Sequence, residues 1–64
     1  MMENHLYNLM AQLVTESKSL KRIKEMYGRD ADGCEPCKSF WSAMEQDKNA
    51  HVEKLNELIK QHNA

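Results

Sequence analysis

The stretch that decides the fold is LYNLMAQLVTESKSLKRIKEMY, at residues 6–27. Seam positions recur in it at alternating steps of three and four, the pattern of an amphipathic helix that packs along another helix. The seam consists of Leu6, Leu9, Leu13, Glu16, Leu20, Ile23 and Tyr27. Neither glycine nor proline interrupts it. We therefore predict a helix over residues 3–27, with Gly28 as its left-handed C-terminal cap.

A second amphipathic segment follows a break in the middle of the chain. Both glycines and the only proline lie between residues 28 and 36, which predicts a loop there. We predict a second helix over residues 37–62. Its apolar face holds Phe40, Trp41, Met44, Val52, Leu55, Leu58 and Ile59. Because a short loop makes consecutive helices antiparallel neighbours, the predicted fold is all-α, an antiparallel helical hairpin forming one domain over residues 1–64.

The hairpin register brings polar residues of the two helices together. The loop joins the two helices at one end, and both helices rise by the same distance per residue. The numbers of two residues that face each other therefore add up to about 64. Glu16 then faces Lys48, with Asp47 beside Lys48 and His51 about one turn away. Carboxylates and imidazoles bind iron, manganese or zinc, so Glu16, Asp47 and His51 form a candidate metal site. The alternative is an ion pair of Glu16 with Lys48 that fixes the register.

The second helix resembles a helix of the ferritin-like, rubrerythrin-type four-helix bundles. The similarity rests on Phe40-Trp41, Met44-Glu45, Asp47-Lys48 and His51-x-x-x-Leu55-x-x-Leu58-Ile59. Those proteins carry a Glu-x-x-His motif on such a helix and a single glutamate on a preceding one. The resemblance implies a di-iron protein with Glu16 as the single glutamate and His51 as the motif histidine. The motif glutamate falls at Lys48, where this sequence departs from the family pattern.

Cys34-Glu35-Pro36-Cys37 is a C-x-x-C motif at the entrance of the second helix. Zinc takes four ligands, and His51 lies about 21 Å from Cys37 along a continuous helix, so a zinc site would require Cys34 and Cys37 from two chains. That arrangement resembles the zinc hook of the long coiled-coil ATPases of DNA repair. The motif also resembles the active-site segment of thioredoxin, which implies a redox role because a helix N-terminus activates a thiolate. Free or reversibly paired cysteines with a structural role are the third alternative.

Two helices alone cover only one side of each apolar stripe, and 64 residues are too few to bury a large core. We therefore expect a homodimer in which two hairpins form a four-helix bundle. The expected interface residues are Leu6, Leu9, Leu13, Leu20, Ile23, Trp41, Met44, Leu55 and Leu58.

Composition excludes several functions. The net charge is −1, whereas a nucleic-acid-binding domain shows a basic excess. No apolar run approaches the ~20 residues that span a bilayer, and the N-terminus lacks a signal peptide, so we expect a cytoplasmic protein without a membrane partner. We expect no catalytic residues and a small non-catalytic helical assembly or binding protein. The alternatives are a ferritin-like protein that binds iron or zinc and a C-x-x-C redox or zinc-stapled protein.

Overall fold

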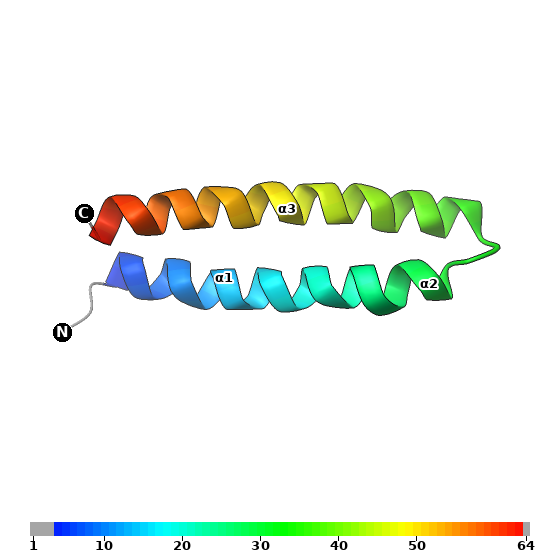
Figure 1. Cartoon of the computed structure of the whole chain (residues 1–64), viewed down its shortest axis with the longest axis horizontal. Coiled ribbons are helices and arrows are strands. Elements are labelled where there is room, and N and C mark those ends of the chain that lie inside the picture. The colour runs from blue at the N-terminus through cyan, green and yellow to red at the C-terminus, as the bar shows by residue number, and fades with distance from the viewer. Residues whose placement is uncertain (1–3, 64) are drawn as a thin grey trace.

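The protein is a hairpin of two long helical rods. The computed structural model describes residues 4–63, which are helical except at residues 31–34. The first rod consists of α1 (Asn4–Arg22), a π-helical turn η1 (Ile23–Tyr27) and the short helix α2 (Gly28–Asp30). Helix α3 (Glu35–Asn63) returns antiparallel beside it (Figure 1). The predicted all-α hairpin is confirmed for this part of the chain.

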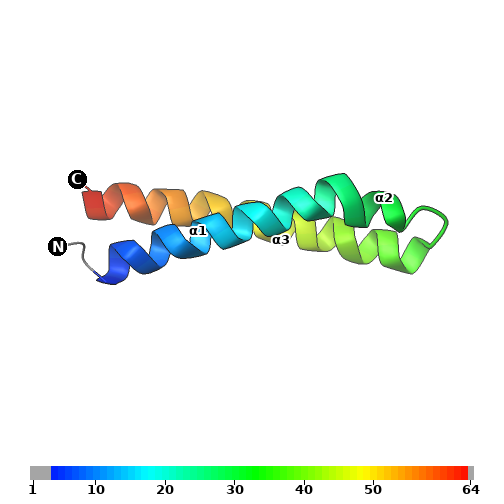
Figure 2. The same ribbon diagram turned by 90° about the horizontal axis from the view of Figure 1, so that it is seen from below.

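The molecule is long and thin, with extents of 49 × 16 × 13 Å. The two rods cross at a shallow angle near the middle of their length (Figure 2), which suits the side-by-side packing of a heptad seam. Ile23 and Ala31 are the only buried apolar residues in the described part of the chain. Apart from Ile23 and the buried Glu16, the seam residues are partly exposed to solvent.

The connection between the rods is shorter than the predicted loop of residues 28–36. The first rod continues past Tyr27 to Asp30, and α3 begins at Glu35. The expectation that Gly28 is a left-handed cap is wrong, because its φ of −62° is helical and its N–H donates to the carbonyl of Ile23. Gly33 takes the left-handed conformation instead, with a φ of 87°.

The π-helical turn explains why the first rod can continue past Tyr27. At about 100° per residue, Ala31 would lie about 80° around an uninterrupted α-helix from Ile23. A π-helical turn accommodates one extra residue, which removes about 100° of rotation and leaves the two residues within about 20° of each other. Ile23 and Ala31 are both buried. The turn therefore places Ala31 on the seam in place of the charged Asp30.

Aromatic contacts fix the register near both ends of the hairpin. Near the loop, the Tyr27 and Trp41 rings lie 4.8 Å apart, and the Phe40 ring lies 5.1 Å from that of Trp41. Near the open end, the rings of His5 and His62 are 6.1 Å apart. At both ends of the hairpin, the numbers of facing residues therefore add up to slightly more than the predicted sum of about 64.

Candidate functional site

A buried carboxylate lies at the centre of the hairpin. Glu16, on the seam of α1, is 7% exposed although it is charged. Lys48 Nζ on α3 donates to its Oε2 at 2.6 Å, and His51 Nδ1 lies 2.8 Å from its Oε1. Because an ionised carboxylate only accepts hydrogen bonds, His51 is the donor in the second contact. Both carboxylate oxygens are therefore occupied by groups from the opposite helix.

The two donors set the protonation state of Glu16. The Lys48 side chain, donating to the carboxylate, is the main cause that lowers the pKa of Glu16 below its usual 4.5, and the His51 hydrogen bond acts in the same direction. Burial opposes both effects, because desolvation disfavours the charged form. Glu16 is consequently ionised at neutral pH and is held between two donors.

The structure brings together two of the three residues predicted for the metal site. Glu16 and His51 are in direct contact, whereas Asp47 is exposed to solvent and makes no hydrogen bond or ion pair with either. Asp47 precedes Lys48 by one residue, so it is rotated by about 100° around α3 from the side chain that reaches Glu16. The described residues contain no group of three or more His, Cys, Asp or Glu placed to hold a metal ion.

Lys48 is the partner that the ion-pair alternative requires. It is 32 residues from Glu16 in sequence, and its side chain is only 18% exposed. The antiparallel register indicated this contact, and the structure confirms it. The prediction of iron or zinc binding at Glu16, Asp47 and His51 stays a prediction, and in this arrangement a metal ion would have to compete with the Lys48 ammonium for one carboxylate oxygen.

The C-x-x-C motif lies at the start of α3. Cys34 immediately precedes the helix, and its carbonyl accepts a hydrogen bond from the Lys38 N–H at 2.9 Å, so Cys34 is the N-cap residue. Both cysteines are free, Cys34 partly exposed and Cys37 exposed. Residue types alone predicted a helix entrance here but not the capping position of Cys34.

The two thiols are electrostatically different. The Cys37 thiol, donating to the Cys34 sulfur, lowers the pKa of Cys34, and the Cys37 backbone adds to this effect. The same thiol contact raises the pKa of Cys37. A negative charge on the pair is therefore held by Cys34. The prediction of zinc at Cys34 and Cys37 stays a prediction, since it depends on a second chain.

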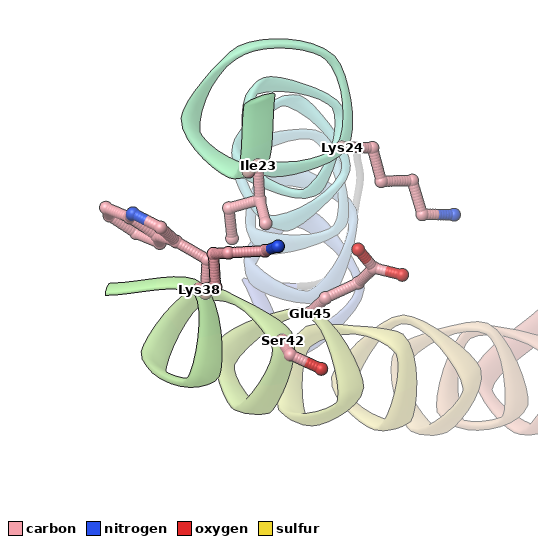
Figure 3. Close-up of a pocket in the computed structure, with 7 residues that line it drawn as sticks. Ile23, Lys24, Lys38, Ser42 and Glu45 are labelled. Carbon is pink, nitrogen blue, oxygen red and sulfur yellow. The ribbon is translucent and has the colours of Figure 1, made fainter. Parts of the chain in front are cut away.

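A shallow groove lies between the rods next to the π-helical turn. Its lining residues are Ile23, Lys24, Gly28, Lys38, Trp41, Ser42 and Glu45. Figure 3 shows Lys38 extending below Ile23, Glu45 pointing towards the first rod, and Lys24 extending to the side. The groove measures about 220 Å³, below the ~300 Å³ at which pockets for drug-sized ligands begin. We assign it no binding role.

Most of the predicted interface residues keep surface that another chain could cover. Ile23 is the exception: it is 2% exposed, so it belongs to the core of the hairpin and not to an interface with a second chain. The others are partly exposed: Leu6, Leu9, Leu13, Leu20, Trp41, Met44, Leu55 and Leu58.

Comparison with known proteins gives no family assignment. No protein-family model, curated protein or solved structure matches the chain. In the part of the chain that is described, no helix has the length and apolar character needed to cross a bilayer.

Proposed function

We propose that this chain is a non-catalytic helical assembly module that acts as a homodimer, with two hairpins packed into a four-helix bundle. The observation that carries the proposal is the small core of the single hairpin, in which Ile23 and Ala31 are the only buried apolar residues among those described. Domains of this size are usually stabilised by disulfides, a metal or oligomerisation. Both cysteines are free here, which favours oligomerisation.

The exposed surface of the chain supports association. A compact monomer of 7.5 kDa exposes about 4,250 Å² by the usual scaling of surface with mass, whereas this chain exposes 4966 Å². The excess of about 700 Å² is close to the ~800 Å² that one partner contributes to a standard protein interface. The hairpin thus has surplus surface of the size that one partner would cover.

A second apolar stripe on α1 supplies a place for the partner. Tyr7, Met10 and Val14 are 62%, 39% and 54% exposed, and their steps of three and four place them on one side of the helix. Each directly follows a leucine of the seam, so this side stripe is turned by about 100° from the face that meets α3. In a four-helix bundle each helix packs against two neighbours, and the directions from its axis to these neighbours differ by roughly 90°. The side stripe points towards the second neighbour.

A second copy of the chain is the partner that fits this surface. The side stripe has no charged residue, and the net charge of the chain is only −1, so two copies approach with little electrostatic repulsion. A two-fold dimer is also the commonest closed assembly of identical chains.

Sedimentation equilibrium over a range of concentrations tests the proposal. We expect the mass of two chains at micromolar concentration. Val14→Lys should weaken the dimer at least about tenfold, or about 1.4 kcal/mol, because it places a charge in an apolar contact. Gln46→Lys is the matched control: Gln46 is exposed and lies about 200° around α3 from Lys48, on the side facing away from α1.

The control separates a local effect from a general effect of added charge. Gln46→Lys should leave the dissociation constant within about twofold. A single-chain mass at tens of micromolar would overturn the proposal. If the two variants weakened the dimer equally, the side stripe would not be part of the dimer interface.

A second candidate function is metal binding by the same bundle, as the ferritin-like resemblance implies. The specific observation in its favour is the contact between Glu16 and His51 across the two rods. A two-fold dimer would supply this pair twice, and carboxylates with imidazoles are ligands for iron and zinc. The Lys48 ammonium at 2.6 Å from Glu16 opposes a cation at this place, so we rank this function second.

A further inference from the structure

The cysteine pair has the geometry of a bond-forming dithiol. Cys34 caps α3 and Cys37 is the third residue of that helix. Positions three apart on a helix have Cα atoms about 5 Å apart, within the ~4.4–6.8 Å range that disulfides span. The two sulfurs can therefore be joined within one helical turn, without moving either rod.

The two sulfurs are not equivalent, which gives them different roles. The Cys34 sulfur accepts hydrogen bonds from the thiol and the backbone N–H of Cys37, and these contacts lower the pKa of Cys34. The pKa of Cys37 is raised by its neighbour. The thiolate is the nucleophile in exchange reactions, so Cys34 is the attacking sulfur and Cys37 the second to react.

A small groove gives access to both sulfurs. Its lining residues are Tyr27, Asp30, Ala31, Cys34, Cys37 and Trp41. It measures about 240 Å³, less than the ~300 Å³ typical of the smallest drug-sized pockets. The Tyr27 and Trp41 rings, 4.8 Å apart, give it an apolar aromatic wall. Exchange needs only one sulfur atom of a small organic disulfide to reach Cys34, so the groove does not have to enclose the whole molecule.

We propose that Cys34 and Cys37 form a reversible dithiol–disulfide couple that exchanges with small organic disulfides. The Cys34 thiolate attacks one sulfur of the small disulfide, whose S–S bond breaks and releases a thiolate that takes up a proton. The Cys37 thiolate, having lost its proton to solvent, attacks the Cys34 sulfur of the mixed disulfide. The internal S–S bond forms and a second small thiol leaves. Two protein thiols are oxidised and one small disulfide is reduced to two thiols.

The inference does not require the dimer, because both cysteines and the groove belong to one chain. Intact-mass measurement with hydroxyethyl disulfide, a small uncharged probe, tests it on the full chain. The unmodified protein should lose two hydrogen atoms and keep no adduct, and a dithiol reductant should reverse the change. Cys37→Ser should instead accumulate one mixed disulfide at Cys34, since no second thiol displaces the adduct.

Cys34→Ser is the matched variant for the rate. In Cys37→Ser the backbone N–H of residue 37 still donates to the Cys34 sulfur and lowers its pKa, whereas the Cys37 thiol has no corresponding donor that lowers its pKa. Cys37→Ser should therefore react faster than Cys34→Ser at pH 7, because a larger fraction of its remaining thiol is ionised. The pH midpoint of its alkylation should also be the lower of the two.

Two results would overturn the inference. One is equal reaction rates of the single-cysteine variants. The other is a stable adduct on the unmodified protein without an internal bond. If a variant loses its helical circular dichroism signal, the test rests on the unmodified protein, which should form the internal disulfide and keep no adduct.

Discussion

Lys48 Nζ donates to Glu16 Oε2 at 2.6 Å, joining two rods at positions 32 residues apart in sequence. The Glu16 side chain is 9% exposed and that of Lys48 is 18% exposed. A pair so poorly solvated acts differently from a surface ion pair, because removing one partner leaves the other charge without compensation.

Replacing Lys48 alone should destabilise the hairpin. Lys48→Met leaves a buried carboxylate with His51 as its remaining donor, which should lower the free energy of unfolding by about 1–3 kcal/mol in urea titrations. The double variant Glu16→Leu with Lys48→Met should recover that loss or exceed the original stability, since an apolar pair of similar volume avoids desolvation of the charges. Strictly additive losses would contradict a buried, coupled pair.

Lys54→Met serves as the exposed control for that comparison. Lys54 Nζ lies 3.7 Å from Glu57 Oε1, and both side chains are largely exposed. Its loss should change the free energy of unfolding by less than about 0.5 kcal/mol.

Acid should weaken the fold through Glu16. Its pKa is lowered from 4.5 by the Lys48 hydrogen bond and then by that of His51, so the unfolded chain binds a proton at this site more readily than the folded chain. The stabilisation is complete above the unfolded pKa and is lost as pH falls through the lower folded pKa. Glu16→Gln should therefore reduce the dependence of the melting temperature on pH between about 5 and about 3. Equal slopes for the two proteins would contradict the assignment.

The ferritin-like interpretation predicts a gain of function at one position. Lys48 and His51 are three residues apart and both reach Glu16, so Lys48→Glu completes a Glu-x-x-His motif facing a glutamate. Without metal, two adjacent carboxylates should lower the melting temperature at pH 7 through like-charge repulsion. Added Zn²⁺ or Mn²⁺ should raise it, and the further change His51→Ala should abolish the rise.

The unmodified protein is the reference for that experiment. Its Lys48 ammonium occupies one oxygen of Glu16, so its melting temperature should respond less to the same metal than that of Lys48→Glu. If the melting temperature of Lys48→Glu did not rise with added metal, the ferritin-like assignment of Glu16, position 48 and His51 as ligands would be contradicted.

Gly33 should tolerate few replacements, for a reason that involves only the backbone. Its φ is 87°, yet no atom lies within 4 Å of where a Cβ would be placed. Gly33→Ala should therefore lower the free energy of unfolding by about 1–2 kcal/mol through left-handed strain alone. Gly33→Asn should cost less, because asparagine adopts this conformation more readily. Thermal melts of the two variants compare these costs.

The sequence was sufficient for the hairpin and for its central contact. Strict three-and-four spacing specified the seam, and counting back from the loop paired Glu16 with Lys48. The same counting places Asp47 too near the site. Neighbouring residues on a helix point in directions about 100° apart, and a sum of residue numbers does not include this rotation.

The loop region could not be predicted in the same way. Gly28 and Gly33 are both chemically suited to a left-handed cap, and the choice between them depends on the π-helical turn. That turn is favoured by burial of Ala31, a tertiary contact that local spacing does not encode. The capping role of Cys34 depends on the same displaced boundary, since it required α3 to begin at Glu35.

The neighbouring rings of His5 and His62 mean that the described chain enters and leaves the hairpin at one place. Such an element can be inserted into a surface turn of a host protein, because its two ends lie close enough to join the two adjacent residues of the turn. The hairpin would then stand out from the host as a stalk with a length of 49 Å, carrying its thiols at the tip.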